Sequence, residues 1–284
     1  MKKVKVKIPA KINITLDVLG VSEGFHQIKS LVTSIALYDT VTVYKRKDYK
    51  VTLTERKVKA GCLLENNVAY KSAKLFMKKF NTLGVDIVID KTIPVGGGLG
   101  GSSADIAGVL LAMKKLFNVS GEIEDLASQL GSDSVYMLGG GFAIIEGKGD
   151  KVTKLNYRNN LPLLLITQDK QVSAKDSYIA YDKLGHCFSP CTDQAIKSLF
   201  NGSLEEFYKV IKNDLQPGSI TLLDSIEKNL KALKDTEAKA VIMTGSGSTV
   251  FAIYKNKKTR NGAYKKLVNN YGKNLIKAST INKI

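Results

Sequence analysis

The 284-residue chain contains no tryptophan and has only five prolines, three cysteines and four arginines. The cysteines, Cys62, Cys187 and Cys191, are an odd number in a long chain, which argues against a disulfide scaffold. His186 lies beside two of them in HCFSPC, but a structural zinc site needs four ligands at tighter spacing. We therefore interpret the cysteines as free thiols of a reducing compartment.

The sequence also lacks a run of about 18 apolar residues, the length that a membrane-spanning helix requires. Its first residues, MKKVKVKIPAKINITL, alternate between apolar and polar side chains and contain no continuous apolar segment of a signal peptide. With 44% hydrophobic and 24% charged residues, the composition is typical of a globular chain. We expect a cytoplasmic protein that does not enter a membrane.

Acidic residues are scarce relative to basic ones: 26 Asp and Glu against 43 Lys and Arg give a formal net charge of +17. Almost all of the excess is lysine spread along the chain, whereas arginine supplies the bidentate fork that phosphates and base edges favour. A dispersed lysine excess is typical of a solvated surface, and it attracts polyanionic small molecules such as nucleotides. We expect no nucleic-acid partner, with a basic RNA-binding protein as the alternative outside enzymes.

Strands and helices are mixed irregularly along the chain. Hydrophobic periodicity predicts strands at 3–9, 13–19, 39–44, 50–55, 85–90 and 161–167, and helices at 68–80 and from the glycine-rich segment to about 118. The early strands come in hairpin-like groups rather than in a βαβ series, which favours an α+β fold over a doubly wound sheet. A polar stretch at 148–160 predicts a boundary between an N-terminal domain, residues 1–155, and a C-terminal domain, residues 156–284.

A glycine-rich loop, PVGGGLGGSSA, occupies Pro94–Ala104 between a predicted strand and a predicted helix. Its glycines expose backbone N–H groups, and the helix N-terminus adds a partial positive charge, so the loop suits phosphate oxygens. Gly96, Gly98 and Gly101 satisfy G-x-G-x-x-G, but helices follow instead of the strand and acidic residue of a dinucleotide fold. The Walker pattern fails because no lysine follows the glycines. The loop predicts another kind of nucleotide-phosphate site, with a flexible turn as the alternative.

The loop resembles the P-x-x-x-G-L-G-(G/S)-S-S-A phosphate loop of the galactokinase–homoserine kinase–mevalonate kinase–phosphomevalonate kinase (GHMP) superfamily. Two further motifs of that superfamily occur in order, PAKIN at 9–13 and MTGSGSTVF at 243–251. Within the superfamily the chain resembles the 4-diphosphocytidyl-2-C-methyl-D-erythritol kinase family, because segments spanning nearly the whole chain fit that family in order. G-(Y/F)-H, here Gly24-Phe25-His26, is a feature of this cytidyl-binding family. Mevalonate-type and homoserine-type kinases are the alternatives within the superfamily.

The resemblance implies the two-domain GHMP kinase architecture, with an N-terminal ribosomal-protein-S5-domain-2-like half and a C-terminal α/β sandwich half. It implies transfer of the γ-phosphoryl group of ATP to a substrate hydroxyl, with Asp133 as the base and Lys11 as its partner cation. The residues alone allow two other interpretations: Lys11 as a charged residue on an amphipathic strand, and Asp133 as a helix cap.

The resemblance also assigns residues to ATP and to the acceptor substrate. Those expected to bind ATP are Asn67, Lys91, Pro94, Gly96, Gly97, Gly98, Leu99, Gly100, Gly101, Ser102 and Ser103. Those expected to bind the acceptor are Asn13, Phe25, His26, Tyr178, Gly245 and Ser246. Mg²⁺ is expected with ATP and is held mainly by phosphates, so no residue is assigned to a metal.

In the acceptor site, an aromatic ring at Phe25 stacks on cytosine, and the imidazole of His26 hydrogen-bonds along the edge of the base. Tyr178 supplies the opposite stacking face, and the turn at Gly245 and Ser246 offers N–H groups to the diphosphate. The alternatives are a loop histidine without a ligand, a core tyrosine and a tight turn between buried strands. We expect a monomer or weak homodimer that acts on small molecules.

Overall fold

The computed structural model describes residues 2–57, 63–185 and 189–282, and within them eleven strands form one sheet. In chain order the strands are β1 (Lys3–Asn13), β2 (Asp17–Ser22), β3 (Phe25–Lys45), β4 (Val51–Arg56), β5 (Val85–Asp90), β6 (Phe142–Gly147), β7 (Lys151–Leu155), β8 (Pro162–Ile166), β9 (Ala240–Met243), β10 (Val250–Ile253) and β11 (Leu275–Ile281). The α-helices are α1 (Val68–Phe80), α2 (Gly101–Phe117), α3 (Glu124–Ser128), α4 (Ser134–Gly139), α5 (Ala174–Leu184), α6 (Thr192–Phe200), α7 (Leu204–Val210), α8 (Gln216–Leu222), α9 (Ser225–Lys234) and α10 (Lys257–Tyr271). Two single-turn 3₁₀ helices are η1 (Leu64–Asn66) and η2 (Gly272–Asn274).

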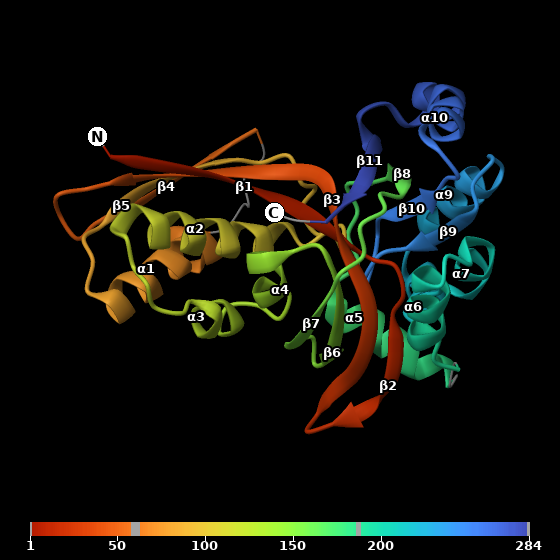
Figure 1. The fold of residues 1–284 in the computed structure, drawn as a ribbon, viewed down its shortest axis with the longest axis horizontal. Helices are drawn as coiled ribbons and strands as arrows, with labels where there is room; N and C mark the ends of the chain where they lie inside the picture. The colour runs from red at the N-terminus through yellow and green to blue at the C-terminus, as the bar shows by residue number, and fades with distance from the viewer. Residues whose placement is uncertain (1, 58–62, 186–188, 283–284) are drawn as a thin grey trace.

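Strand β3 is 21 residues long and pairs with β1, β2, β5, β6 and β11, all antiparallel. It is rich in Val, Ile, Thr and Tyr, the side chains that suit a pleated surface. Its register with β1 shifts between Pro9 and Ala10, beside a residue that has no N–H to donate to the sheet. In Figure 1, β3 runs from the N-terminal half through the centre of the molecule to the tip of the β2–β3 hairpin.

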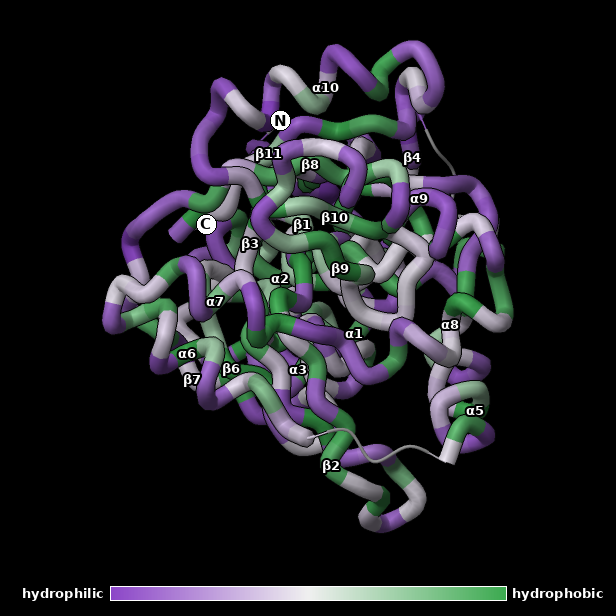
Figure 2. Tube along the Cα trace, turned by 90° about the vertical axis from the view of Figure 1, so that its right-hand side faces the viewer, coloured by the Kyte–Doolittle hydropathy of each residue, from purple (hydrophilic) through white to green (hydrophobic). Residues whose placement is uncertain are grey.

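The molecule has two halves that share this sheet. In the N-terminal half, α1–α4 lie on one face of β1, β3, β4 and β5, and β8–β11 lie in the other half (Figure 1). Strand β11 joins them, because it pairs with β3 and with β8. Apolar residues of α1 and α2 pack against β3 and β5, and a second cluster packs α9 and α10 against the C-terminal strands. Figure 2 shows the apolar segments in the interior and the polar helix α10 outside.

The expected α+β class is confirmed by this arrangement, in which β4 and β5 form the one parallel pair among the strand pairs of the described residues. The helix at 68–80 and the strand at 85–90 have the predicted bounds, and Asn67 caps α1 by accepting a hydrogen bond from the backbone N–H of Ala69. The strand predicted at 13–19 is wrong in its bounds. The chain is irregular between β1 and β2, where two successive N–H groups both bond to the Leu31 carbonyl. The domain boundary at residue 155 stays a prediction; the chain there passes from β7 to β8.

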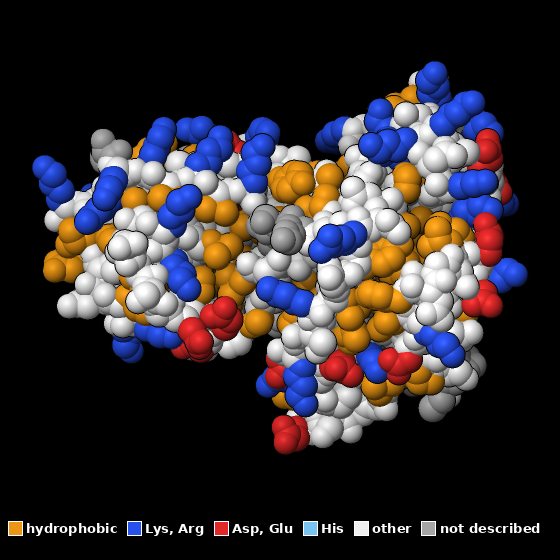
Figure 3. Space-filling model, viewed as in Figure 1, with side chains coloured by type: hydrophobic (Ala, Val, Ile, Leu, Met, Phe, Trp, Pro, Cys, Tyr) orange, Lys and Arg blue, Asp and Glu red, His pale blue; other side chains and the backbone are white. Residues whose placement is uncertain are grey.

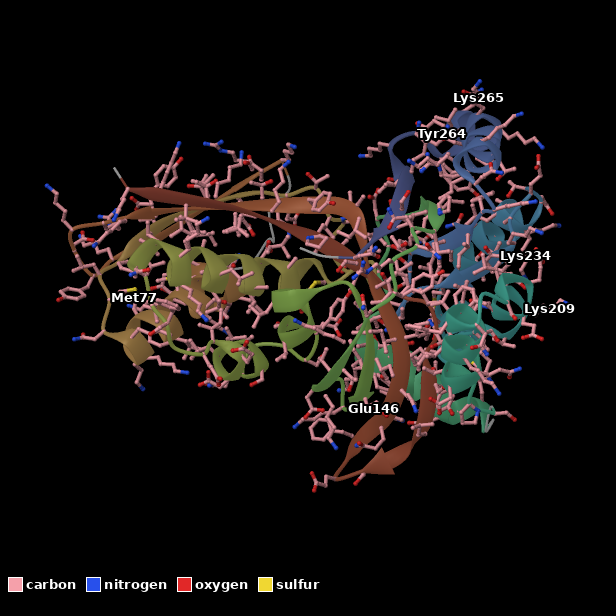
Figure 4. All side chains as sticks on the ribbon, viewed as in Figure 1. Met77, Glu146, Lys209, Lys234, Tyr264 and Lys265 are labelled. Atoms are coloured by element: carbon pink, nitrogen blue, oxygen red, sulfur yellow. The ribbon has the colours of Figure 1, made fainter. Side chains whose placement is uncertain are left out.

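On the face drawn in Figure 3, Lys and Arg side chains are spread over both halves of the molecule. Lys209, Lys234 and Lys265, on α7, α9 and α10, are exposed and point away from the body of the protein (Figure 4). This spread is typical of a solvated surface. Among the described residues, no helix combines the length and the apolar composition needed to cross a bilayer.

Candidate active site

The glycine-rich loop connects β5 to α2, as its sequence predicts, and it contacts β1 and the turn that follows β9. Gly98 and Gly100 have φ of +74° and +73°, a conformation that glycine adopts without strain. A Cβ at Gly98 would overlap the carbonyl oxygen of Thr244, and one at Gly100 would overlap the side chain of Met137. The Leu99 carbonyl accepts a 3.0 Å hydrogen bond from the backbone N–H of Lys11, which fastens the loop to β1.

A cavity of about 280 Å³ lies against this loop. The loop residues that line it are Val95, Gly96, Gly97, Gly98, Leu99, Gly100, Gly101, Ser102 and Ser103. Asp133, Ser246 and the segment 171–174 complete the lining. The loop thus presents its backbone at the start of α2 to an open cavity, the arrangement that binds phosphate groups.

Lys11 and Asp133 form an ion pair at the edge of this cavity. The Lys11 ammonium lies 3.0 Å from Asp133 Oδ2 and donates a 2.7 Å hydrogen bond to Asn13 Oδ1. Lys11 is buried, with 6% of its side chain exposed, whereas 29% of the Asp133 side chain is exposed. Asp133 stands at the N-cap of α4, but its side chain makes no capping hydrogen bond. Lys11 thus lies on a stretch of β1 that is buried on both faces rather than amphipathic, and Asp133 occupies the cap position of α4 without capping the helix through its side chain.

A second cavity, of about 220 Å³, adjoins the first and shares with it Gly98, Gly100, Asp133, Ala174 and Ser246. Its other lining residues are Lys11, Asn13, Leu16, Ile28, Ser132, Lys148, Gly149, Tyr178, Leu215 and Gly245. The Lys11–Asp133 pair therefore lies where two adjoining cavities meet.

The turn between β9 and β10 is held beside the glycine loop. The Asn213 side-chain amide donates to the carbonyl oxygens of Met243 and Gly245, at 2.8 and 2.7 Å. Thr244 Oγ1 accepts a 2.9 Å hydrogen bond from the backbone N–H of Asn13. The turn is tight and lies between buried strands, and it also places Gly245 and Ser246 at the smaller cavity.

His26 contacts the smaller cavity only through Tyr178: Tyr178 lines the cavity, whereas His26 lies outside its lining. Their rings stack with centroids 4.5 Å apart and an angle of 18° between planes. His26 Nε2 also lies 2.8 Å from a carboxylate oxygen of Asp182, on the same helix as Tyr178. Burial raises the pKa of the Tyr178 hydroxyl to about 12. Phe25 does not line the smaller cavity. It begins β3 at the hairpin tip and is 58% exposed, and the ammonium of Lys148 lies 5.7 Å from the centroid of its ring.

Three residues expected to bind ATP lie outside the lining of the glycine-loop cavity. Pro94 immediately precedes that lining. Lys91 is buried and pairs with Asp39 and Asp105. Asn67 caps α1 and donates to Glu55. The structure thus gives the Lys91 and Asn67 side chains protein partners, and their predicted contact with the nucleoside stays a prediction.

No cluster of three or more His, Cys, Asp or Glu side chains suited to a metal ion occurs in residues 2–57, 63–185 and 189–282. Of the residues considered for a zinc site, His186 and Cys187 lie outside the described residues, as does Cys62. Cys191 is a buried free thiol.

A larger hollow, of about 690 Å³, lies in the N-terminal half beside Lys2, Lys45, Lys47 and Leu83. Arg46 also lines it, but its guanidinium is bound to Asp48 and Asp86. Because the hollow lacks a base beside an anion-binding loop, the chemistry favours the two smaller cavities as the active site.

Several residues of the site were not assigned from the sequence. Segment 171–174 leads into α5 and carries no motif that marks it as part of a phosphate site. Asn213 lies in KNDLQP, a segment that fits the family pattern, and that resemblance was the available signal. Lys148 follows β6 in a glycine turn, and only the fold brings it to the cavity.

Two family models match the chain: the GHMP kinases N terminal domain over residues 67–145 and GHMP kinases C terminal over residues 195–274. A curated 4-diphosphocytidyl-2-C-methyl-D-erythritol kinase of Clostridium beijerinckii is 35% identical over 261 residues, which cover 88% of this chain and 90% of that protein. The enzyme of the same name from Clostridium tetani is 34% identical over 273 residues, or 94% and 96% of the two chains. A crystal structure of 4-(cytidine 5'-diphospho)-2C-methyl-D-erythritol kinase superposes with a TM-score of 0.83 at 25% identity, covering 98% of this chain and 99% of that one.

Proposed function

We propose that this chain, which belongs to the 4-diphosphocytidyl-2-C-methyl-D-erythritol kinase family, transfers the γ-phosphoryl group of ATP to a hydroxyl of that cytidyl alcohol. The products are the 2-phosphate and ADP, in the non-mevalonate synthesis of isoprenoid precursors. The observation that carries the proposal is the Lys11–Asp133 pair, which lies between a glycine loop and a second cavity that adjoins the loop's own.

The glycine loop holds the ATP phosphates in this proposal. Positive-φ glycines and the N-terminus of α2 present backbone N–H groups to the cavity, and a Cβ at Gly98 or Gly100 would alter the backbone path that does so. Mg²⁺, held mainly by phosphate oxygens and water, supplies charge neutralisation when bound with ATP.

Asp133 accepts the proton of the substrate hydroxyl as the hydroxyl attacks phosphorus. Its partly exposed carboxylate reaches both cavities, so one group can contact the hydroxyl on one side and face the loop-bound phosphate on the other. Lys11 holds the carboxylate by the 3.0 Å ion pair and adds positive charge where the phosphoryl oxygens become more negative. Asn13 receives a hydrogen bond from the same ammonium, which fixes the ammonium between two oxygens.

The smaller cavity receives the acceptor. Gly245 and Ser246 offer N–H groups to its diphosphate, and the net charge of +17 favours approach of such an anion. His26 hydrogen-bonds the cytosine edge, while Phe25 and Tyr178 provide aromatic surface for stacking. Tyr178 already stacks on His26, so it also orients the imidazole.

A substrate panel tests the proposal. Purified protein with Mg²⁺ and ATP is offered the cytidyl alcohol, mevalonate or homoserine, and ADP release is followed by a coupled assay. We expect release with the cytidyl alcohol alone, and a new phosphomonoester in the ³¹P spectrum. The Asp133→Asn protein, prepared in the same way, controls for contaminating kinases. ADP release with mevalonate or homoserine instead would refute the substrate, and salt-sensitive RNA binding without any kinase activity would favour the RNA-binding alternative.

A further inference from the structure

Beneath the glycine loop, three charged residues far apart in the sequence form a buried cluster, here called the anchor cluster: Asp39 on β3, Lys91 after β5 and Asp105 on α2. The Lys91 ammonium lies 2.6 Å from Asp39 Oδ2 and 2.8 Å from Asp105 Oδ2. All three side chains are at least nine-tenths buried. Burying charges is costly unless they are paired, so these contacts define their positions tightly.

The anchor cluster holds both ends of the glycine loop. On the incoming side, Asp39 Oδ1 accepts hydrogen bonds from the backbone N–H groups of Thr92 and Ile93, at 2.5 and 2.8 Å. On the outgoing side, Lys91 binds Asp105 in α2 and lies 3.4 Å from the carbonyl oxygen of Gly101, the first residue of that helix. A single ammonium therefore links the strand that leads into the loop with the helix that leaves it.

The cluster carries one more negative charge than positive when both carboxylates are ionised. Asp105 Oδ1 is buried and has no hydrogen-bond partner among the described residues. Burial, reinforced by the charges of Asp39 and Glu55 and opposed by Lys91, raises the pKa of Asp105 to about 7. A buried carboxylate with an unsatisfied oxygen destabilises the folded protein, which points to a functional role for Asp105 rather than a stabilising one.

We infer that Lys91, Asp39 and Asp105 are positioning residues that fix the glycine loop in its nucleotide-binding shape. The inference rests on the proposed function, because it takes the loop to be the phosphate site. None of the three side chains lines the glycine-loop cavity, so each acts through the loop backbone. With Asp105 ionised, the charge-assisted bond to Lys91 holds the loop ordered before ATP arrives, and binding then costs less conformational entropy.

Other charged groups around α2 are engaged elsewhere or already counted. From β1 and α4 come Lys11 and Asp133, which pair with each other. From β4 comes Glu55, which accepts a hydrogen bond from Asn67. The buried residues of α1 are uncharged. The raised pKa of Asp105 lies near neutrality, and loss of its charge weakens the link between Lys91 and α2.

The test measures affinity for the ATP analogue AMP-PNP with Mg²⁺, by calorimetry at pH 6 and pH 8, for wild type and Asp105→Asn. We expect the variant to bind about tenfold more weakly at pH 8, the loss of one charge-assisted hydrogen bond. At pH 6, where wild-type Asp105 is mostly protonated, the two affinities should agree within about twofold. Titration of the nucleotide itself cancels in the ratio. Asp39→Asn, which keeps an oxygen for the two backbone N–H groups, should also weaken binding at pH 8.

Asp214→Asn is the matched control. Asp214 is 2% exposed, also has a raised pKa and a carboxylate oxygen without a hydrogen bond, here 3.7 Å from the Lys212 ammonium, and its other oxygen binds the backbone N–H of Val18 on β2 instead of the loop. We expect its AMP-PNP affinity to equal that of wild type at both pH values. Equal affinities of wild type and Asp105→Asn at pH 8 would overturn the inference. So would a loss of the same size at pH 6 and pH 8, since the charge would then be irrelevant. A wild type that binds no AMP-PNP would overturn the proposed function itself, and the inference with it.

Discussion

Replacing Asp105 by asparagine should stabilise the ligand-free protein near neutral pH, the opposite of what loss of a buried ion-pair partner usually does. Burial raises the pKa of Asp105 from an ordinary value of 3.8 to about 7. Between these values the folded protein keeps a proton that the unfolded chain has released. Stability is therefore fully present below about pH 4 and is lost as the pH rises through 7.

The size of this loss follows from the same two values. A difference of about three pH units, at roughly 1.4 kcal/mol each, corresponds to about 4 kcal/mol for the fully ionised group. Asparagine has nearly the same shape and does not titrate, so the variant escapes the loss. Part of this loss has already occurred at pH 5, where the unfolded carboxyl is mostly ionised. We therefore expect the difference in unfolding free energy, variant minus wild type, to increase by about 2.6 kcal/mol between pH 5 and pH 8.

Urea unfolding of both proteins at pH 5, 6, 7 and 8, followed by circular dichroism, measures this difference. The other titratable groups contribute equally to the unfolding free energies of the two proteins, so their contributions cancel in the difference. A difference that stays constant across the range, or that turns against the variant as the pH rises, would refute the reasoning. It would mean that Lys91 compensates the carboxylate fully.

The remaining predictions concern the two substrate cavities. His26→Ala should raise KM for the cytidyl substrate on the order of tenfold and leave KM for ATP within about twofold, because its imidazole stacks on Tyr178 of the acceptor cavity and does not line the glycine-loop cavity; equal changes in both constants would contradict this. Asp182→Ala, which removes the carboxylate 2.8 Å from His26 Nε2, should raise the same KM severalfold with kcat unchanged, and a normal KM in steady-state assays would refute an orienting role. Gly98→Ala should weaken AMP-PNP binding at least tenfold, since its Cβ would overlap the Thr244 carbonyl, whereas Gly202→Ala, at a φ of +76° with open space, should bind normally in the same calorimetric assay. Normal binding by Gly98→Ala would show that the loop tolerates another backbone path.

Local elements of the fold could be predicted from the sequence because their signals lie within a few residues. The helix at 68–80 has an asparagine N-cap and a single apolar face, and the strand at 85–90 alternates strictly. The glycine loop was placed between a strand and a helix for the same reason. Asn118 ends α2 in a left-handed conformation, close to where the apolar pattern stops.

Such local patterns did not predict the features of the fold that depend on contacts between distant parts of the chain. Strand β3 continues through 21 residues because it pairs with five partners, and nothing local in its sequence marks that continuity. The closing strand β11 was not predicted, although it joins the two halves. The break between β1 and β2 is set by tertiary hydrogen bonds to Leu31, not by a turn motif.

In the candidate site, too, local patterns did not predict which side chains come together in the fold. Spacing alone left Lys11 and Asp133 as a strand residue and a helix cap, and only the family resemblance joined them; the structure places them 3.0 Å apart. Lys91 follows a strand beside the glycine loop, and its sequence position does not show that its side chain pairs with Asp39 and Asp105. Its predicted contact with the nucleoside stays a prediction.

The most direct test of the account is single-turnover phosphoryl transfer by Asp133→Asn with saturating ATP and cytidyl substrate, alongside its AMP-PNP affinity. Lys7→Ala, an exposed lysine on the same strand as Lys11, serves as a control for Lys11→Ala. We predict that Asp133→Asn and Lys11→Ala bind AMP-PNP while transfer slows by about 10²- to 10⁴-fold, the range for loss of a positioned proton acceptor. Near-normal transfer by Asp133→Asn would contradict it, because the pair between the two cavities would then have no part in the chemistry.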